Sequence, residues 1–488
     1  MQREIWSSRT GFILATVGSA VGLGNIWRFN YLTYENGGGA FLIPYFVALF
    51  TAGISLIILE LALGSKFKGA APLALKRANK RFEWIGWWAA LSGFIITMYY
   101  VVIVGWALIY LEKAFVLGWG EDANGYFFGT VLQLTDSAWD LGGFPVPVLL
   151  GAAAVWGVTW IVEAKGVQAG IEKANRIFMP LLWILALVLV ARALTLEGAF
   201  TGIDWYLKPD FNRLFEYHVW LAAYGQIFYT LGIGMAIMIA YGSYLPDGSD
   251  IANNALIVSL ANGAFSFLMG FAVFGTLGYM AAASGQGVDQ VVADGIGLAF
   301  VVFPTALNLL PGLNALTAVA FFACLVVAGL SSLVSLVEGF VASLMDKFEM
   351  ERGRAVRVTV VFGLLGSLLY ASRGGLYWLD IVDHFIMIYG LLVVGTLEAV
   401  AIGWIFGAGK IKEWVNASSD VRAGIWWDLS VKLIVPVVLV VLVAEETASN
   451  LATPYGGYPQ MAAYLGMALM AAGIALSLLL SMVRREVD

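Results

Sequence analysis

Long apolar runs separated by short polar segments dominate the chain. A helix needs about 20 mostly apolar residues to cross the hydrocarbon core of a bilayer, and twelve runs approach or exceed that length. They cover residues 10–34, 40–64, 86–118, 145–163, 171–194, 218–244, 254–283, 314–345, 356–372, 377–407, 427–447 and 460–483. The pattern predicts an all-α membrane protein with twelve transmembrane helices.

Composition supports this prediction and excludes several classes of function. Hydrophobic residues make up 60% of the 488 residues and charged residues 12%, whereas soluble domains are about half apolar and a quarter charged. The lipid bilayer is therefore the expected surrounding. The only histidines are His218 and His384 and the only cysteine is Cys324, which excludes an intrachain disulfide and a zinc or haem site built on them. No basic cluster with interleaved aromatics is present, so nucleic acid is not an expected partner.

The distribution of basic residues predicts the orientation. If the N-terminus is cytoplasmic, twenty Lys and Arg residues lie on the cytoplasmic side, including Arg484 and Arg485 near the C-terminus. Only five lie outside, namely Lys113, Arg192, Lys208, Arg213 and Arg373. Cytoplasmic loops are enriched in Lys and Arg, so we expect both termini in the cytoplasm and the protein in the plasma or inner membrane. The first run continues past Val21, which argues against a cleaved signal peptide.

Two apolar runs are interrupted by glycine at corresponding places. The first contains Gly22-Leu23-Gly24, followed by Asn25 and Arg28, and the sixth contains Gly232-Ile233-Gly234. Glycine weakens a helix, and arginine in hydrocarbon is costly without a partner or water. Glycines can also serve only close helix packing, but each interruption here opens a block of five runs. This placement favours broken helices that line a binding site.

The interruptions therefore divide a single transmembrane transporter domain, residues 1–488, into two inverted repeats. The first repeat is 10–194 and the second is 218–407, with two additional spans in 427–483. Unwound backbone at the middle of a membrane offers carbonyl groups to a cation and N–H groups to a carboxylate.

Several motifs resemble those of the neurotransmitter:sodium symporter family, which has the fold of the bacterial leucine transporter. The resemblance covers nearly the whole chain. It is carried by GSAVGLGNIWRF through ENGGGAFLIPYF, GQIFYTLGIGMAIMIAYGSY, ANGAFSFLMGFAVFGTLGYMA, AGLSSLVSLVE and GTLEAVAIGWIFGAGK. It implies twelve transmembrane helices, formed by a 5+5 inverted repeat with broken helices 1 and 6 plus two additional helices. It also implies a secondary active symporter that works by alternating access.

The resemblance implies two sodium sites made only of oxygen ligands, which suit a hard cation. The first site, completed by a substrate carboxylate, matches the Ala20 carbonyl and the side chains of Asn25, Thr230 and Asn262. The second site matches the carbonyls of Gly18, Val21 and Ala328 and the hydroxyls of Ser331 and Ser332. Taken alone, such serines would indicate ordinary hydrogen bonding between helices.

The resemblance also implies a chloride site. Chloride-dependent members bind the ion with neutral donors that match Tyr45, Gln226, Thr230, Asn262 and Ser266. In chloride-independent bacterial relatives an acidic side chain stands at the position of Ser266. Because no Asp or Glu occurs between residues 251 and 288, we predict chloride dependence. The alternatives are ordinary polar contacts between helices, or compensation by a more distant acid.

The substrate pocket implied by the resemblance is mainly apolar. Its members are Ala20, Gly22, Leu23, Gly24, Ile96, Tyr100, Tyr229, Thr230, Gly232, Met235, Ser332 and Leu336. Amine transporters have an aspartate at the position of Gly22, so the expected substrate is an amino acid that brings its own carboxylate. A large apolar or aromatic amino acid fits this pocket, and so does a flexible ω-amino acid such as GABA.

The resemblance further implies two gates. The external gate matches Arg28 and Asp383, an ion pair that would explain how Arg28 is tolerated, with Tyr100 and Tyr229 forming an aromatic lid over the substrate.

The cytoplasmic gate matches Arg3, Trp6, Tyr244 and Asp346. Glu60 faces the unwound first span in relatives, and we expect it to accept N–H groups freed there.

Two alternatives to a symporter differ in class. An intramembrane enzyme would need a nucleophile with a base or a metal set, and the serines of the eighth run have no nearby histidine. A non-transporting amino acid sensor on the same fold would lack ion ligands, and these are present. A homodimer through the last two spans stays open.

Overall fold

The computed structural model describes residues 3–285, 287–288 and 295–483, and the described part is helical throughout apart from turns and one isolated bridge between Gly38 and Pro209. Arg484 and Arg485, used above for the orientation, lie outside the described residues.

Ten helices in the described part are long and apolar enough to cross a membrane. Five of them are single α-helices: Val146–Ala164 (α8), Ile251–Ser284 (α13), Asn314–Phe348 (α16), Arg352–Ala371 (α17) and Gln460–Met482 (α23). Two consist mainly of one α-helix: Lys80–Ala114 contains α7 (Glu83–Ala114), and Val167–Leu194 contains α9 (Lys173–Leu194). The other three contain several α-helices in sequence: Gly39–Phe67 contains α4 (Gly39–Ala48) and α5 (Ile54–Phe67); Gly375–Asn416 contains α18 (Gly375–Phe385), α19 (Val393–Val400) and α20 (Ala408–Asn416); and Ile425–Gly457 contains α21 (Ile425–Leu429) and α22 (Val435–Ala452). Shorter helices connect them: α6 (Ala71–Ala78), α10 (Ala199–Leu207), α14 (Gly295–Gly297) and α15 (Phe303–Leu309).

The two remaining predicted runs are broken helices. The first consists of α1 (Arg9–Ala20) followed by α2 (Leu23–Ile26) and α3 (Arg28–Glu35), and the two parts are bent by 65°. The sixth consists of α11 (Tyr217–Thr230) and α12 (Ile237–Ser243), with non-helical backbone at 231–236. All twelve predicted runs are therefore helical, which confirms an all-α, multi-pass membrane protein.

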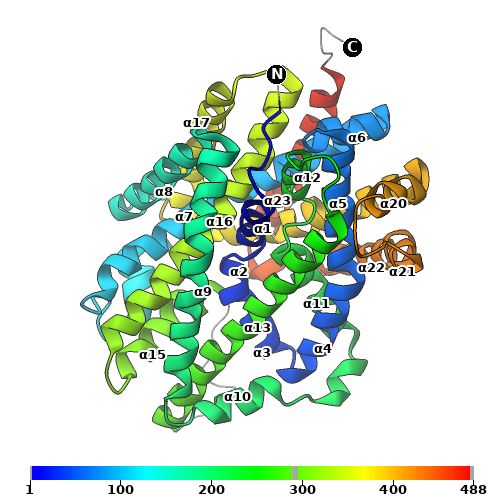
Figure 1. Cartoon of the computed structure of the whole chain (residues 1–488). Helices are drawn as coiled ribbons and strands as arrows, with labels where there is room; N and C mark the ends of the chain where they lie inside the picture. The colour runs from blue at the N-terminus through cyan, green and yellow to red at the C-terminus, as the bar shows by residue number, and fades with distance from the viewer. Residues whose placement is uncertain (1–2, 286, 289–294, 484–488) are drawn as a thin grey trace.

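The broken helices lie inside the bundle. Helix α1 contacts α9, α13 and α16, while α12 packs against α5 and α16. In the most apolar stretch of α16, 89% of the residues are buried inside the protein, against 17% in α23. Figure 1 shows α1 and α2 surrounded by longer helices, with both chain ends at the upper end of the molecule. The structure thus places the two interruptions away from lipid.

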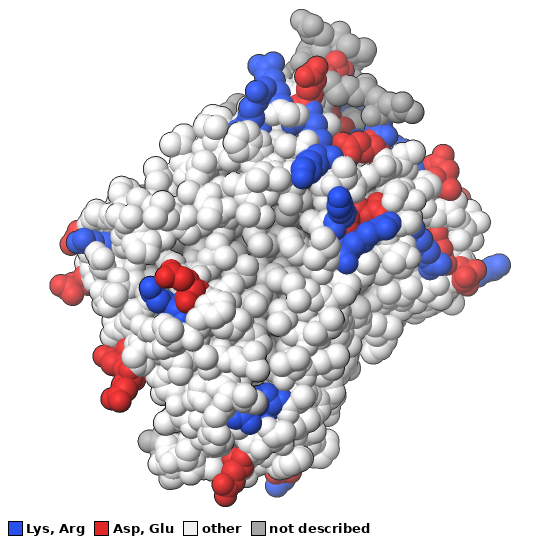
Figure 2. Space-filling view, turned by 60° about the vertical axis from the view of Figure 1, so that its left-hand side comes forward, with Lys and Arg blue, Asp and Glu red and all other residues white. Residues whose placement is uncertain are grey.

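Charged side chains are sparse over the middle of the outer face seen in Figure 2. The face in Figure 2 is white over most of its height, and Lys and Arg gather mainly toward the upper end, where the chain termini lie. A wide uncharged band is what a lipid-facing surface requires. On this face the basic residues therefore gather mainly at the end of the molecule that carries the chain termini.

Helices α5 and α12 approach so closely that their contact requires glycine. A Cβ atom on Gly64 would lie 2.0 Å from the carbonyl oxygen of Ile239, and one on Gly242 would lie 2.5 Å from that of Leu61. Small residues allow such close approach of backbones in membrane proteins. This contact fixes the short α12, which follows the second interruption, against a long continuous helix.

We therefore expect Gly64→Ala to lower the free energy of unfolding by about 1–3 kcal/mol, because the added methyl group forces the two backbones apart. The measurement is the thermal unfolding of purified protein in detergent. Gly157→Ala on α8 is the matched control, since a Cβ there meets nothing within 4 Å. It should be neutral or stabilising by up to about 1 kcal/mol. Equal stability of both variants would contradict the close contact.

Candidate functional site

The first interruption is stabilised by Asn25. Helix α1 ends at Ala20, Val21 has extended backbone angles, and Gly22 precedes α2 with φ −128° and ψ −166°. The side-chain oxygen Oδ1 of Asn25 accepts a hydrogen bond from the Gly22 N–H at 2.8 Å. This contact satisfies a backbone donor that the break would leave without a partner in a buried site.

The second interruption contains three residues with left-handed backbone. Gly232 has φ +66°, Gly234 has φ +74° and Ala236 has φ +64°. The sequence points to both glycines, but it gives no signal for Ala236, which is a rare conformation for a residue with a side chain. Glu60 accepts a hydrogen bond from the Gly234 N–H at 2.8 Å. The expectation for Glu60 therefore needs correction, because the backbone contact that it makes is with the sixth span.

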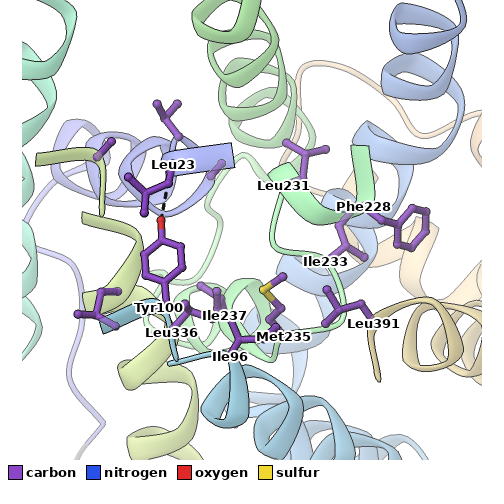
Figure 3. Packing of buried hydrophobic residues seen from close by; sticks show 14 of the residues in the cluster. Leu23, Ile96, Tyr100, Phe228, Leu231, Ile233, Met235, Ile237, Leu336 and Leu391 are labelled. Carbon is purple, nitrogen blue, oxygen red and sulfur yellow. Dashed lines mark hydrogen bonds between the residues drawn. The ribbon is translucent and has the colours of Figure 1, made fainter. Parts of the chain in front are cut away.

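The two interruptions border a cavity. All predicted substrate-pocket residues except Leu23 line it, and Ser19, Asn25 and Ile237 line it in addition. Leu23 lies just behind, where its N–H donates to the Tyr100 hydroxyl at 3.2 Å. Figure 3 shows this bond, with Ile96, Met235, Ile237 and Leu336 gathered near the Tyr100 ring.

Two glycines of the first interruption keep the cavity open. A Cβ on Gly22 would lie 2.7 Å from Ser332 Oγ and 3.0 Å from the Tyr100 hydroxyl. One on Gly24 would lie 2.6 Å from the Tyr229 ring. No Asp, Glu, Lys or Arg lines this cavity, so it offers backbone groups, hydroxyls and apolar surface.

The side chains predicted for the first sodium site lie together. Asn262 Oδ1 accepts hydrogen bonds from Asn25 Nδ2 at 2.8 Å and from Thr230 Oγ1 at 3.1 Å. All three residues are buried, and Ala20 lines the same cavity. Neutral oxygens in this arrangement suit a hard cation. Within the described residues no group of three or more His, Cys, Asp or Glu side chains is suited to a metal ion.

Part of the residue set predicted for the second sodium site lies together at the contact of α1 with α16. Ser332 Oγ lies 3.4, 3.1 and 3.4 Å from the carbonyl oxygens of Gly18, Ser19 and Val21. Ser331 Oγ lies 2.9 Å from the carbonyl oxygen of Ala328. The end of α1 thus presents several carbonyl oxygens to one hydroxyl of α16. The Ser19 carbonyl is not among the ligands predicted from the sequence.

The predicted chloride residues form one buried group with unused polar atoms. Tyr45 donates to Ser266 Oγ at 3.4 Å, and Ser266 Oγ also accepts from Asn25 Nδ2 at 2.7 Å. Asn262 Nδ2 and Gln226 Oε1 have no hydrogen-bond partner. Buried polar atoms normally have partners, so an orphaned amide donor beside two hydroxyls fits an anion. A flip of the Gln226 side-chain amide exchanges its oxygen and nitrogen, so that this residue can also present a donor.

The external gate residues do not form the expected ion pair. The Arg28 guanidinium lies over the Tyr229 ring, 4.5 Å from its centroid, and Asp383 accepts from the Tyr99 hydroxyl at 2.5 Å. Both Arg28 and Asp383 line a second cavity. The cation–π contact compensates for part of the cost of placing Arg28 here. The expectation of a direct Arg28–Asp383 contact is corrected, because Arg28 stacks on Tyr229 and Asp383 binds the Tyr99 hydroxyl instead.

At the opposite end the predicted gate residues are tightly connected. Arg3 Nη1 lies 2.7 Å from Asp346 Oδ1, and its guanidinium lies over the Tyr244 ring at 5.1 Å. Trp6 Nε1 donates to the Tyr241 carbonyl at 3.0 Å. These contacts hold the N-terminal segment across α12 and α16. The structure is therefore closed at the end that carries the chain termini.

An all-helical membrane protein with two broken helices around a neutral, oxygen-lined cavity has the architecture of ion-coupled transporters. The sequence model of the sodium:neurotransmitter symporter family matches residues 3–126 and 120–486. The chain belongs to this family, whose members are sodium-coupled transporters and not enzymes.

Individual relatives agree with the family assignment. An uncharacterized sodium-dependent transporter of Methanocaldococcus jannaschii is 48% identical over 98% of both chains. The bovine sodium-dependent dopamine transporter is 32% identical over 97% of this chain and 73% of its own. The human sodium- and chloride-dependent neutral and basic amino acid transporter B(0+) is 30% identical over 96% of this chain and 83% of its own. Since amine and amino acid transporters are about equally similar, overall identity does not separate these substrates.

The closed end depends on Asp346, which also accepts from the Ala70 N–H at 2.7 Å. We expect Asp346→Asn to raise amide hydrogen exchange in residues 3–8 roughly tenfold, since one charge-assisted contact is lost. Asp247→Asn is the control, because Asp247 is 83% exposed in its ion pair with Lys68 and exposed pairs contribute little. Unchanged exchange in Asp346→Asn would show that this ion pair does not hold the segment.

Proposed function

We propose that this sodium-dependent transporter imports a neutral, apolar or aromatic amino acid together with sodium and chloride. The observation that carries the proposal is the cavity between the two helix interruptions, which exposes backbone polar groups and has no charged side chain in its lining. A ligand bound there must supply its own carboxylate and amino group. A charged side chain on the ligand would have no partner of opposite charge.

The geometry suggests how an amino acid binds. Its carboxylate would accept from the N–H groups of Leu23 and Gly24 and from the Tyr100 hydroxyl, and would complete the first sodium site. Its amino group would donate to the carbonyls of Ala20, Tyr229 and Thr230. The apolar side chains of Ile96, Met235, Ile237 and Leu336 would surround the substrate side chain, with added space at Gly232.

Two co-transported sodium ions would use the two oxygen sets described above. Asn25, Thr230, Asn262 and the Ala20 carbonyl would hold the first, and the carbonyls of α1 with Ser331 and Ser332 would hold the second. Two added positive charges in a buried site need compensation. The substrate carboxylate would contact the first sodium, but the substrate ammonium group keeps the amino acid neutral as a whole. Chloride at Tyr45, Gln226, Thr230, Asn262 and Ser266 would offset one of the two sodium charges.

Alternating access would proceed by movement between the two inverted repeats, 10–194 and 218–407. The closed end with Arg3 and Asp346 would face the cytoplasm, and the cavity beside Arg28 and Asp383 would face outward. Ion binding would order the interruptions, and substrate would draw Tyr229 toward Tyr100. Location in the plasma or inner membrane with cytoplasmic termini, and a homodimer through spans 427–483, belong to the same proposal.

GABA or another ω-amino acid is the second candidate substrate. The backbone bend at Gly232 leaves room, since a Cβ there would meet only Ile237 and Met235 at 3.4 and 4.0 Å. A flexible chain with carboxylate and amine at opposite ends can use that room without filling the apolar pocket. A non-transporting sensor would bind the same ligands without flux.

Uptake into proteoliposomes with an inward sodium gradient tests these proposals. The screen uses the standard amino acids and GABA, and chloride is replaced by gluconate in parallel. We expect uptake of an apolar or aromatic amino acid that requires sodium and falls at least roughly tenfold without chloride, because the buried ion charges then lack compensation. Preferred uptake of GABA would select the second candidate. Sodium-dependent binding without flux would indicate the sensor.

Chloride dependence depends on the neutral residue at Ser266. We expect Ser266→Glu to transport without chloride, because a fixed carboxylate beside Tyr45 and Asn262 replaces the anion. Uptake by this variant should differ less than about twofold between chloride and gluconate. Ser266→Gln is the neutral control of the same size and should keep the chloride requirement. A chloride requirement retained by a folded, active Ser266→Glu would contradict the site.

A further inference from the structure

A group of acidic side chains surrounds Arg352 at the closed end. Arg352 is the first residue of α17, Glu163 lies near the end of α8, Glu338 lies on α16 and Glu4 belongs to the N-terminal segment. Arg352 Nη2 lies 2.6 Å from Glu338 Oε2 and 3.5 Å from Glu163 Oε2, and Arg352 Nη1 lies 3.5 Å from Glu4 Oε1. The single positive charge of Arg352 is therefore shared by three carboxyl groups.

The two inner carboxyl groups have unequal surroundings. Glu338 receives both terminal nitrogens of Arg352, at 3.2 and 2.6 Å, and also accepts from the Tyr244 hydroxyl. Glu163 has only the long contact to Arg352, and its Oε1 has no hydrogen-bond partner. Glu338 is thus the carboxyl group that Arg352 compensates, whereas the surroundings of Glu163 are those of a neutral carboxylic acid.

The charges around the pair support the same assignment. The side chains of Glu163 and Glu338 are fully buried, and one oxygen of each lies near the same guanidinium nitrogen, Arg352 Nη2. Besides Arg352 and Glu4, the titratable group that faces Glu163 is Tyr241 of α12, whose hydroxyl donates to Ser335 at 2.8 Å and adds no positive charge. Two adjacent buried carboxylates with one shared cation do not both stay ionised, because the repulsion is not screened by water.

We propose that Glu163 is a proton-binding site of the closed end, and that its proton exchanges with the aqueous phase when this end opens. In the closed state the acid proton bridges Glu163 and Glu338. The bridge is covered by the N-terminal segment, whose Glu4 accepts from the Val167 N–H at 2.6 Å.

Opening would remove Glu4 together with Arg3 and Trp6, since all belong to this segment. Water would then reach Glu163, and Arg352 would be released from Glu4 to compensate a second carboxylate. Glu163 would give its proton to water and become ionised, and closing would take one proton back. Low pH on this side therefore favours the closed end, and the ratio of closed to open forms changes by up to about tenfold per pH unit for one proton.

The protonation state can be tested without transport. Glutamine imitates a neutral carboxylic acid in size and charge, so Glu163→Gln should unfold within about 2 °C of the wild type. The matched variant Glu338→Gln removes the ionised partner of Arg352 and should lower the unfolding temperature by roughly 5 °C or more, or fail to fold. Infrared spectroscopy of folded protein should show a protonated-carboxyl band that is lost in Glu163→Gln. Severe destabilisation by Glu163→Gln, or absence of this band, would overturn the assignment.

The link to opening rests on the proposed function and needs a separate measurement. Uptake into proteoliposomes is followed with the lumen buffered at acid or alkaline pH and the external pH fixed, for protein oriented with its termini inside. Wild-type rates should depend on luminal pH, and Glu163→Gln should lose this dependence while remaining active. An unchanged dependence in Glu163→Gln would overturn proton exchange at Glu163. Absence of uptake in the wild type would instead count against the proposed function and leave the stability and infrared results standing.

Discussion

Backbone groups freed by two broken helices must find partners inside the protein, and this constraint governs the rest of the structure. In an apolar surrounding each unpaired N–H or C=O group costs several kcal/mol, so a break persists only where side chains replace the missing helical bonds. Asn25 does so for Gly22, and Glu60 does so for Gly234. Asn25 lies on α2 and Glu60 on α5. Helices α13 and α16 pack against α2, and α5 and α16 pack against α12, so that these helices cover the breaks.

The same polar atoms are the candidate ligands, which links stability of the breaks to binding. In this structure the amide of Asn25 and the hydroxyl of Thr230 both donate to Asn262 Oδ1. A cation bound at the proposed first sodium site would need these oxygens directed toward it, so the two donors would have to turn away from Asn262 Oδ1. Ion binding there would therefore rearrange the contacts that hold α2, α11 and α13 together. A local exchange of hydrogen bonds can in this way change the position of helix segments.

The sequence predicts the spans, the interruptions and nearly the whole cavity lining, because these depend on local pattern and on motifs matched residue by residue. Gly22 and Gly24 leave room for the side chains of Ser332 and Tyr229, and Gly232 and Gly234 adopt positive φ angles. The left-handed Ala236 has no such signature, since its conformation is imposed by the surrounding helices. The predicted partners of Glu60 and Arg28 are wrong for a related reason, since Glu60 binds Gly234 and Arg28 stacks on Tyr229. Contacts between distant helices depend on the side-chain register and on the conformational state, and a sequence motif specifies neither.

The group of acidic side chains around Arg352 is another contact between distant helices that the sequence does not predict. Glu163 is one acidic residue near the end of an apolar run, and only the packing of α8, α16 and α17 brings it against Glu338. Its position bears on how the closed end can open. Arg3, Asp346 and Trp6 form a connected set that favours closure, whereas a fully ionised Glu4, Glu163 and Glu338 around one arginine would oppose it. A bound proton removes one of these negative charges, so closure is stabilised without further cations. On the proposal made above, loss of that proton on hydration would stabilise the open end. The closed and open ends would then be closer in free energy, as alternation between two states requires.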